Sequence, residues 1–256
     1  MPPEQGWPVF VLSLADGVAR RAPLLARLAE AGISCEVIPA LDGRAGLPAE
    51  AEALIDRDAA RRRMGRPMRD AEFACALSHL GIYRLIAERR LAGAVILEDD
   101  AVPLPGFAAF LAAGAHRRAP FLQFCYGSAR VMRGTEREAI PGVVTYELAL
   151  PAALTVAYSV SAPAAAALLR AATPVAATAD WPCDTTRLGA RIVVPKLVHR
   201  PTPSVVPSTI GGARRARDLG LPDPKMRLSR FVRRDYWRRW WRKRGSFWLP
   251  EEPGPA

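Results

Sequence analysis

Two apolar runs separated by one helical pattern, all within the first 43 residues, constrain the fold of this chain more than any other feature. Residues 8–14 are predicted to form a buried strand, because the run is almost wholly apolar and rich in β-branched and aromatic side chains. A helix then extends to about Ala31, with Asp16 as its predicted cap, and Gly32 ends it. Residues 35–38 form the second strand. A strand–helix–strand unit of this length is a right-handed crossover and therefore predicts a parallel sheet.

The chain continues to alternate helical patterns with short buried strands up to about residue 194. We predict helices over about 70–90, 106–113 and 163–172, and strands over 94–97, 121–124, 143–149, 154–160 and 192–194. This alternation indicates an α/β fold, a mixed, mainly parallel sheet with helices on both faces. The uncharged stretch 148–169 is nominally long enough to cross a membrane, but its prolines and hydroxyl side chains favour a strand followed by a helix. We therefore expect no transmembrane segment.

The net charge of +11 is unevenly distributed along the chain. Residues 1–212 carry 23 basic and 20 acidic side chains, whereas residues 213–244 carry 13 basic and 3 acidic ones. We therefore divide the chain into a catalytic domain over 1–212 and a basic tail rich in Arg and Trp over 213–256. Because a nucleic-acid-binding core would carry its own basic face, no nucleic acid is expected as a partner of the domain.

The cysteines and the N-terminus narrow the cellular context. The four cysteines are widely spaced and form no CxxC pair, so neither a disulfide framework nor a zinc site is expected. Residues 1–7 contain no basic segment before an apolar run, so the sequence predicts no secretory signal. We expect a cytoplasmic protein.

Three consecutive carboxylates, Glu98, Asp99 and Asp100, directly follow the predicted strand 94–97. In open α/β sheets, ligands bind beyond the carboxyl ends of strands. Adjacent carboxylates repel one another near a core edge unless a cation neutralises them. Mg²⁺ and Mn²⁺ are commonly held by one or two carboxylates together with substrate phosphates, and neutralise a diphosphate leaving group. From the tripeptide alone, a solvated acidic turn is an equally good interpretation.

Two sequence motifs, one of which contains this acidic cluster, resemble those of a known protein family. The segment Glu72–Leu80, which contains Leu-Ser-His, and the segment Ile96–Asp100 strongly resemble glycosyltransferase family 25 of lipooligosaccharide biosynthesis, which also includes collagen galactosyltransferases. Weaker matches follow in the same order at residues 9–14, 39–43, 155–161 and 181–184, so the resemblance covers about residues 8–210. It implies a GT-A-like fold, a UDP-sugar donor, often UDP-galactose, and usually inversion at the anomeric carbon.

The resemblance also implies roles for the acidic cluster and the nearby histidines. Asp100 is the first choice as ligand of Mn²⁺ or Mg²⁺, and Asp99 or Glu98 would contact the ribose or a metal-bound water. His79, next to Ser78, is expected on the helix face opposite the apolar stripe, where it could link a donor phosphate to a carboxylate. His199 follows the last strand and is a further candidate metal ligand, although a structural role weighs more for it.

Direct displacement with inversion needs a base for the acceptor hydroxyl, and a carboxylate is the usual choice. Asp184 is the candidate, with Asp180 in reserve. Asp184 is equally placed to cap a helix that begins at Thr185. Arg20 and Arg21 are candidates for pairing with donor phosphates, with a solvated helix face as the alternative.

Residues 224–247 combine aromatic side chains, including Trp237, Trp240 and Trp241, with ten basic residues. Clustered Trp and Arg suit an interfacial helix on an anionic leaflet, so we expect peripheral association with the inner membrane. A tail that is disordered or packed on the domain is the plainer alternative, and nucleic-acid binding is another.

These observations together favour a bacterial glycosyltransferase that moves a hexose from a UDP-sugar to a lipopolysaccharide or related glycan acceptor. Two other classes remain open. A metal-dependent phosphohydrolase would use the same acidic cluster and release phosphate from simple esters. A non-enzymatic membrane or nucleic-acid adaptor would act through the basic tail and would not need Asp100.

Overall fold

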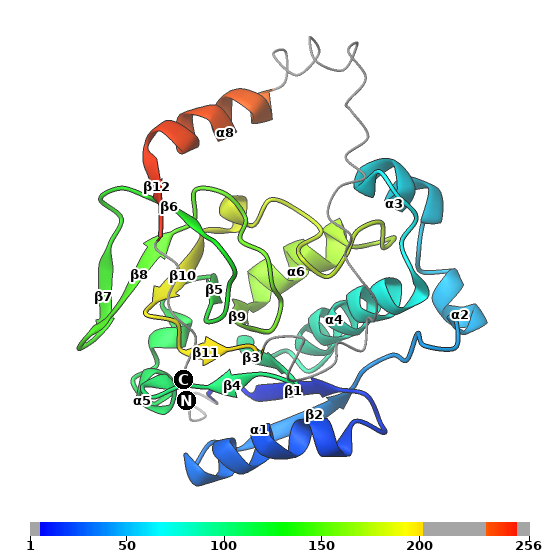
Figure 1. The fold of residues 1–256 in the computed structure, drawn as a ribbon, viewed down its shortest axis with the longest axis horizontal. Coiled ribbons are helices and arrows are strands. Elements are labelled where there is room, and N and C mark those ends of the chain that lie inside the picture. The colour runs from blue at the N-terminus through cyan, green and yellow to red at the C-terminus, as the bar shows by residue number, and fades with distance from the viewer. Residues whose placement is uncertain (1–5, 202–233, 250–256) are drawn as a thin grey trace.

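The computed structural model describes residues 6–201 and 234–249. An eight-stranded sheet runs through this part of the chain, in the order β2-β1-β3-β9-β5-β10-β8-β7 (Figure 1). Its strands are β1 (Val9–Ser13), β2 (Cys35–Pro39), β3 (Gly93–Glu98), β5 (Phe121–Gln123), β7 (Arg137–Ile140), β8 (Val143–Glu147), β9 (Ala157–Ser161) and β10 (Ala190–Val194). Strand β1 pairs in parallel with β2 and β3, and β10 with β5; the other neighbours are antiparallel. The predicted mixed α/β sheet is confirmed, with its parallel pairs concentrated around β1.

The N-terminal strand–helix–strand unit forms as predicted. Helix α1 (Val18–Glu30) connects β1 to β2, and Val11 lies opposite Val37 in the parallel register. The prediction that Asp16 caps this helix is wrong. Gly17 occupies the cap position without a side-chain hydrogen bond, because the Asp16 carboxylate turns toward Arg44 and pairs with its Nη2 at 2.7 Å.

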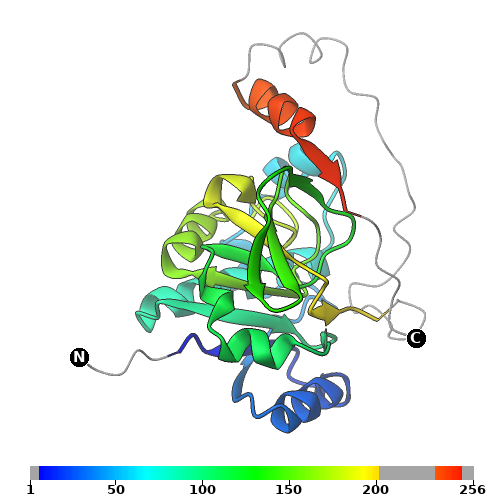
Figure 2. The ribbon, with the colours of Figure 1, turned by 90° about the vertical axis from the view of Figure 1, so that its left-hand side faces the viewer.

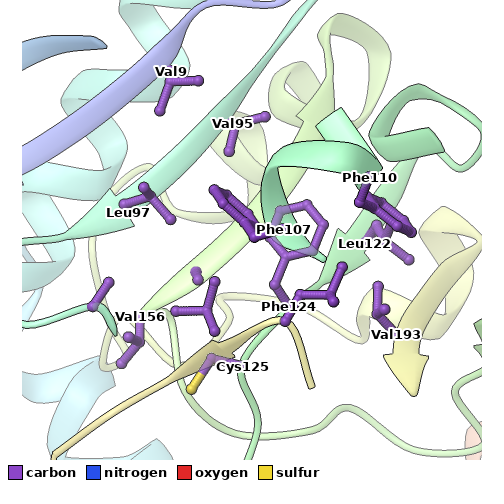
Figure 3. Close-up of a cluster of buried hydrophobic side chains, with 14 of the residues drawn as sticks. Val9, Val95, Leu97, Phe107, Phe110, Leu122, Phe124, Cys125, Val156 and Val193 are labelled. Carbon is purple, nitrogen blue, oxygen red and sulfur yellow. The ribbon is translucent and has the colours of Figure 1, made fainter. Parts of the chain in front are cut away.

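Helices cover both faces of the sheet. They are α2 (Ala49–Glu52), α3 (Arg57–Met64), α4 (Asp70–Glu88), α5 (Phe107–Ala112) and α6 (Ala162–Ala171), with short 3-10 turns η1 (Ala115–Arg117) and η2 (Thr185–Leu188). Successive side chains of a strand point to opposite faces. Accordingly, Val9 and Val11 pack with α1 and α5, whereas Phe10 and Leu12 pack with α4 and α6. Figure 3 shows the first of these cores, where the rings of α5 meet Phe124 edge to face.

Two small strand pairs were not predicted. Strand β4 (Val102–Pro103) pairs with β11 (Val198–His199), and β6 (Arg130–Met132) pairs with β12 (Ser246–Trp248). Strand β12 directly follows helix α8 (Arg234–Arg244), at the end of the molecule opposite α1 (Figure 2). Residues 234–249 of the predicted tail therefore pack on the domain, as the alternative to a purely membrane-bound or disordered tail predicted. The predicted boundary at residue 212 lies outside the described residues.

The uncharged stretch at 148–169 folds as predicted, into β9 followed by α6. Among the helices that the structure describes, none has the length and apolar character that spanning a bilayer requires.

Candidate functional site

A pocket opens where β1, β2 and β3 end, between these strand ends and helix α4. It encloses about 650 Å³ of space, which includes open solvent at its mouth. Its walls come from the ends of β1 and β2, from one side of α4, from Glu98 and Asp99 after β3, and from Arg20 and Arg200. Because β1 and β3 run parallel and adjacent, their carboxyl ends meet at one edge of the sheet. The predicted location of the site beyond strand β3 is where the structure has its pocket.

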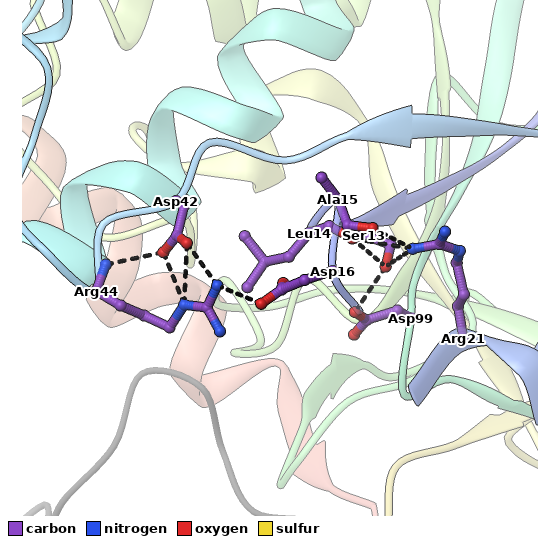
Figure 4. A network of polar contacts seen from close by, with 8 residues as sticks. All are labelled: Ser13, Leu14, Ala15, Asp16, Arg21, Asp42, Arg44 and Asp99. Carbon is purple, nitrogen blue, oxygen red and sulfur yellow. Dashed lines mark hydrogen bonds and ion pairs between the residues drawn. The ribbon is translucent and has the colours of Figure 1, made fainter. Parts of the chain in front are cut away.

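A buried ion-pair network holds the acidic cluster at the edge of this pocket, which Glu98 and Asp99 line and Asp100 adjoins. The Ser13 hydroxyl donates to Asp99 Oδ2 at 3.0 Å, as Figure 4 shows. Arg20 bridges the two aspartates, with Nε 2.7 Å from Asp99 Oδ1 and Nη2 2.6 Å from Asp100 Oδ2. Arg200 Nε lies 3.6 Å from the same Asp100 oxygen. Burial raises the pKa values of Asp99 and Asp100, and the charge of Arg20 opposes this rise.

The two aspartates fit a hard divalent cation. Their side chains are only 12% and 5% exposed. Asp100 Oδ1 is buried and has no hydrogen-bond partner among the described residues. A buried carboxylate oxygen without a partner carries a desolvation cost, which an ion would offset. Carboxylate oxygens are the ligands that Mn²⁺ and Mg²⁺ prefer, so this donor set suits either ion.

Glu98, the first acid of the cluster, faces away from this pair toward His79. The carboxylate accepts a hydrogen bond from the Thr155 hydroxyl at 2.6 Å and lies 3.3 Å from His79 Nε2. The other ring nitrogen, Nδ1, lies 2.9 Å from the Tyr158 hydroxyl, which in turn donates to Tyr83. Although burial raises the pKa of Glu98, the hydrogen bond and charge of His79 and the hydroxyl of Thr155 lower it below its ordinary value. Glu98 is therefore ionised.

His79 is predicted on the helix face opposite the apolar stripe, and in the structure that position of α4 is buried. His79 is 2% exposed, because α4 packs against the sheet on one side and against α6 on another. A histidine in the middle of α4 is therefore buried whichever side it faces. Its contacts make it a positioning residue for Glu98.

The thiol of Cys75 lies beside His79 and Glu98. Its sulfur, a nitrogen of His79 and an oxygen of Glu98 lie within 4.8 Å of one another. Burial, followed by the charges of Glu98 and Asp180, raises the pKa of Cys75 well above its ordinary value. Because the thiol stays protonated and both nitrogens of His79 have partners, Asp99 and Asp100 are the better ligands for a hard ion.

The side chains of Ser78 and Arg21 hydrogen-bond to backbone groups, and Ser78 also lines the pocket. The Ser78 hydroxyl accepts from the Leu41 amide at 2.9 Å and donates to the Ala74 carbonyl at 2.7 Å, which joins the turn after β2 to α4. Arg21 donates to the Leu14 carbonyl at 2.9 Å and supports the end of β1.

His199 lies in β11, opposite Val102, and is not among the residues that line the pocket. Burial and the charge of Lys196 lower its pKa. The next residue, Arg200, reaches the pocket instead, and no sequence motif pointed to it. Thr155 and Cys75 were also missed as site residues, although both lie inside the motifs that carry the family resemblance.

The two candidate bases lie in different surroundings. Asp184 caps η2 by accepting from the Thr186 amide and hydroxyl, and it pairs with Arg238 at 3.0 Å. Burial raises the pKa of Asp184, but Thr186 and the nearby arginines bring it below its ordinary value. Asp180 accepts from the Leu154 amide at 3.0 Å, and its charge acts on the pocket residue Cys75. The structure brings neither carboxylate into the pocket wall.

Comparison with known proteins identifies the family of this chain. Residues 7–146 match the family model described as glycosyltransferase family 25 (LPS biosynthesis protein), which covers more than half of the chain. The chain belongs to this family. The match spans β1 to β8 and includes the pocket ends of β1, β2 and β3.

Individual relatives in the family differ in what their names state. Procollagen galactosyltransferase 1 of Danio rerio is 35% identical over 95 residues, which is 36% of this chain and 16% of that relative. A probable inactive glycosyltransferase 25 family member 3 of Rattus norvegicus and an inactive glycosyltransferase 25 family member 3 of Mus musculus are each 37% identical over 98 residues. These matches cover 36% of this chain and 17% and 16% of the two relatives, so the matched segment spans about a sixth of the length of each relative.

Proposed function

We propose that this protein is a glycosyltransferase that moves a hexose, galactose in the first instance, from a UDP-sugar to a glycan acceptor of the lipopolysaccharide type. The observation that carries the proposal is the pair Asp99 and Asp100, bridged by Arg20. Asp99 and Arg20 line the open pocket, and Asp100 lies next to Asp99 behind its wall. Galactose comes from the name of the Danio rerio relative, and the acceptor class from the family description.

The proposed roles follow from the contacts. Asp99 and Asp100 would hold Mn²⁺ or Mg²⁺, and that ion would neutralise the charge of the departing nucleotide diphosphate. The Ser13 hydroxyl orients Asp99 from the end of β1. Arg20 and Arg200 supply guanidinium groups at the pocket wall that suit donor phosphates. His79 and Thr155 keep Glu98 ionised and fixed in direction.

For the base, Asp180 now takes precedence over Asp184. The Asp184 carboxylate is occupied by its cap and by Arg238, and these contacts lower its pKa and its basicity. The charge of Asp180 acts on Cys75 at the pocket. Inversion at the anomeric carbon remains part of the proposal, because a base acting in one displacement step leads to inversion.

Turnover of isotope-labelled UDP-galactose, UDP-glucose and UDP-N-acetylhexosamines, measured with and without Mn²⁺, tests this function. We expect Mn²⁺-dependent release of UDP from at least one donor, and a loss of about 100-fold or more in Asp100→Asn. Asp58→Asn, a change at an exposed position of α3, is the matched control and should retain full activity.

Two results would contradict the proposal. Failure of the folded wild-type chain to turn over any of these donors would group it with the relatives whose names state that they are inactive. Release of inorganic phosphate from simple esters, without any sugar transfer, would favour the phosphohydrolase instead.

A further inference from the structure

Helix α8 has an aromatic stripe, which consists of Tyr236, Trp237, Trp240 and Trp241. Tyr236 and Trp240 are four residues apart, as are Trp237 and Trp241, and residues at this spacing share a helix face. The four rings together therefore cover one broad arc of the helix. Neighbouring rings along the stripe contact each other edge to face, with centroids 5.5, 5.8 and 4.9 Å apart. The stripe is therefore a continuous run of aromatic rings about one and a half turns long.

The opposite face of α8 is basic, and this face contacts the domain. Arg238 donates to the Asp184 carboxylate at 3.0 Å and to the Thr186 hydroxyl at 2.9 Å. Arg242 donates to the Leu148 carbonyl at 2.6 Å. Strand β12 then continues from the helix into its pairing with β6. The helix is thus attached through charged groups. Trp237 and Trp241 of the aromatic stripe are exposed, and Tyr236 and Trp240 are half-buried.

This orientation is the reverse of the usual one. A helix on the surface of a globular domain normally buries its apolar face and exposes its charges. Here Trp237 is 45% exposed and Trp241 is 64% exposed. A contiguous exposed apolar surface of this kind marks an interaction site. Figures 1 and 2 both show α8 at the end of the molecule remote from α1.

We propose that the aromatic stripe, together with Lys243 and Arg244, binds the surface of an anionic lipid bilayer. Tryptophan rings lodge at the level of the headgroups, and neighbouring cations pair with anionic lipids. Lys243 and Arg244 are both exposed, whereas Arg238 and Arg242 are committed to the domain. This inference does not depend on the proposed transferase activity.

The packing of the rings favours a bilayer over a single-stranded nucleic acid. Bases bind to aromatic side chains by stacking on open ring faces. In the stripe, the rings contact each other edge to face, and the Arg244 guanidinium covers the Trp240 ring at 4.5 Å from its centroid. The stripe therefore offers an apolar surface bordered by charge rather than separate stacking platforms.

Sedimentation of the full chain with vesicles tests the proposal. We expect binding to vesicles of equal parts phosphatidylglycerol and phosphatidylcholine, much weaker binding to pure phosphatidylcholine, and weakening by salt. The double variant Trp237→Ser/Trp241→Ser should partition at least about tenfold less. Lys243→Ser/Arg244→Ser should partition about thirtyfold less. Circular dichroism of each variant establishes that the domain is folded.

A matched control removes charge without touching the stripe. Arg61→Ser/Arg62→Ser changes two exposed basic residues of α3 and should bind anionic vesicles within about twofold of wild type. Phosphatidylglycerol with brominated acyl chains should quench wild-type tryptophan fluorescence more than that of the Trp237→Ser/Trp241→Ser variant. The proposal is overturned if wild type does not bind anionic vesicles, if the tryptophan variant binds as well as wild type, or if a single-stranded oligonucleotide binds more tightly than the vesicles.

Discussion

The Asp184 carboxylate has two structural roles, as cap of η2 and as partner of Arg238 on α8. We therefore expect Asp184→Ala to lower the free energy of unfolding by about 1–2 kcal/mol, because a cap and an ion pair are lost together. Sugar transfer by this variant should fall by less than tenfold, whereas Asp180→Asn should lose about 100-fold or more. Urea denaturation and steady-state kinetics measure the two effects separately. A loss of 100-fold in Asp184→Ala with unchanged stability would show instead that Asp184 is the base.

His116 makes the stability of the protein depend on pH. Its side chain is buried against Trp7, and neither ring nitrogen has a hydrogen-bond partner among the described residues. Burial and the charge of Arg117 lower its pKa to about 4, from an ordinary value of about 6.5. The unfolded chain therefore takes up a proton near pH 6.5, while the folded chain does so only near pH 4.

The contribution of His116 to the free energy of unfolding is therefore fully present above pH 6.5 and decreases as the pH falls from 6.5 toward 4. In His116→Phe, the decrease in the free energy of unfolding between pH 7 and pH 4.5 should be smaller than in wild type. Urea denaturation at several pH values within this window measures the difference. An identical decrease in both proteins would show that His116 titrates normally in the folded state.

At the scale of elements, the contact between the turn after β2 and helix α4 depends on Gly43. A Cβ atom at this position would lie 2.6 Å from the Asp70 carbonyl and 2.7 Å from the Ala74 Cβ. Gly43→Ala must push α4 away from the turn, so we expect a loss of about 1–3 kcal/mol in the free energy of unfolding. Because Gly43 also lines the pocket, ligand binding should weaken as well.

Gly81 is the natural comparison within the same helix. It is exposed on α4, and a Cβ atom there would meet nothing within 4 Å. Gly81→Ala should therefore stabilise the protein by about 1 kcal/mol, because alanine is the better helix former. Urea denaturation of the two variants should give changes of opposite sign. Equal stability of Gly43→Ala and wild type would mean that the turn and α4 are loosely packed.

The longer elements could be predicted because each is a buried run with one clear period. Strand β1 and helix α1 are examples, and their boundaries in the structure lie within a few residues of those expected. The pairs β4–β11 and β6–β12 could not be predicted, since strands of two or three residues contain no periodicity. The orientation of α8 could not be predicted either, because it depends on Asp184 and on the backbone carbonyls of Leu148 and Ala149, which follow β8.

At the scale of the whole molecule, the location of the candidate site could be predicted from the fold, but the residues that surround the acidic cluster could not. A strand that ends in Glu98, Asp99 and Asp100 predicts a polar site at the sheet edge, and the pocket is there. Arg200 is a hundred residues away in sequence, and only the pairing of β11 with β4 brings it to Asp100. The burial of His79 likewise depends on packing between α4 and α6, which no local pattern encodes.

The central claim is that Asp99 and Asp100 hold a divalent ion that helps this pocket bind a nucleoside diphosphate. Titration calorimetry with UDP, in the presence and absence of Mn²⁺, tests it most directly, with wild type, Asp100→Asn and the control Asp58→Asn compared. We predict that UDP binds wild type and Asp58→Asn only with Mn²⁺, and binds Asp100→Asn at least about tenfold more weakly. Absence of UDP binding to the folded wild type, or equal binding by Asp100→Asn, would contradict the account.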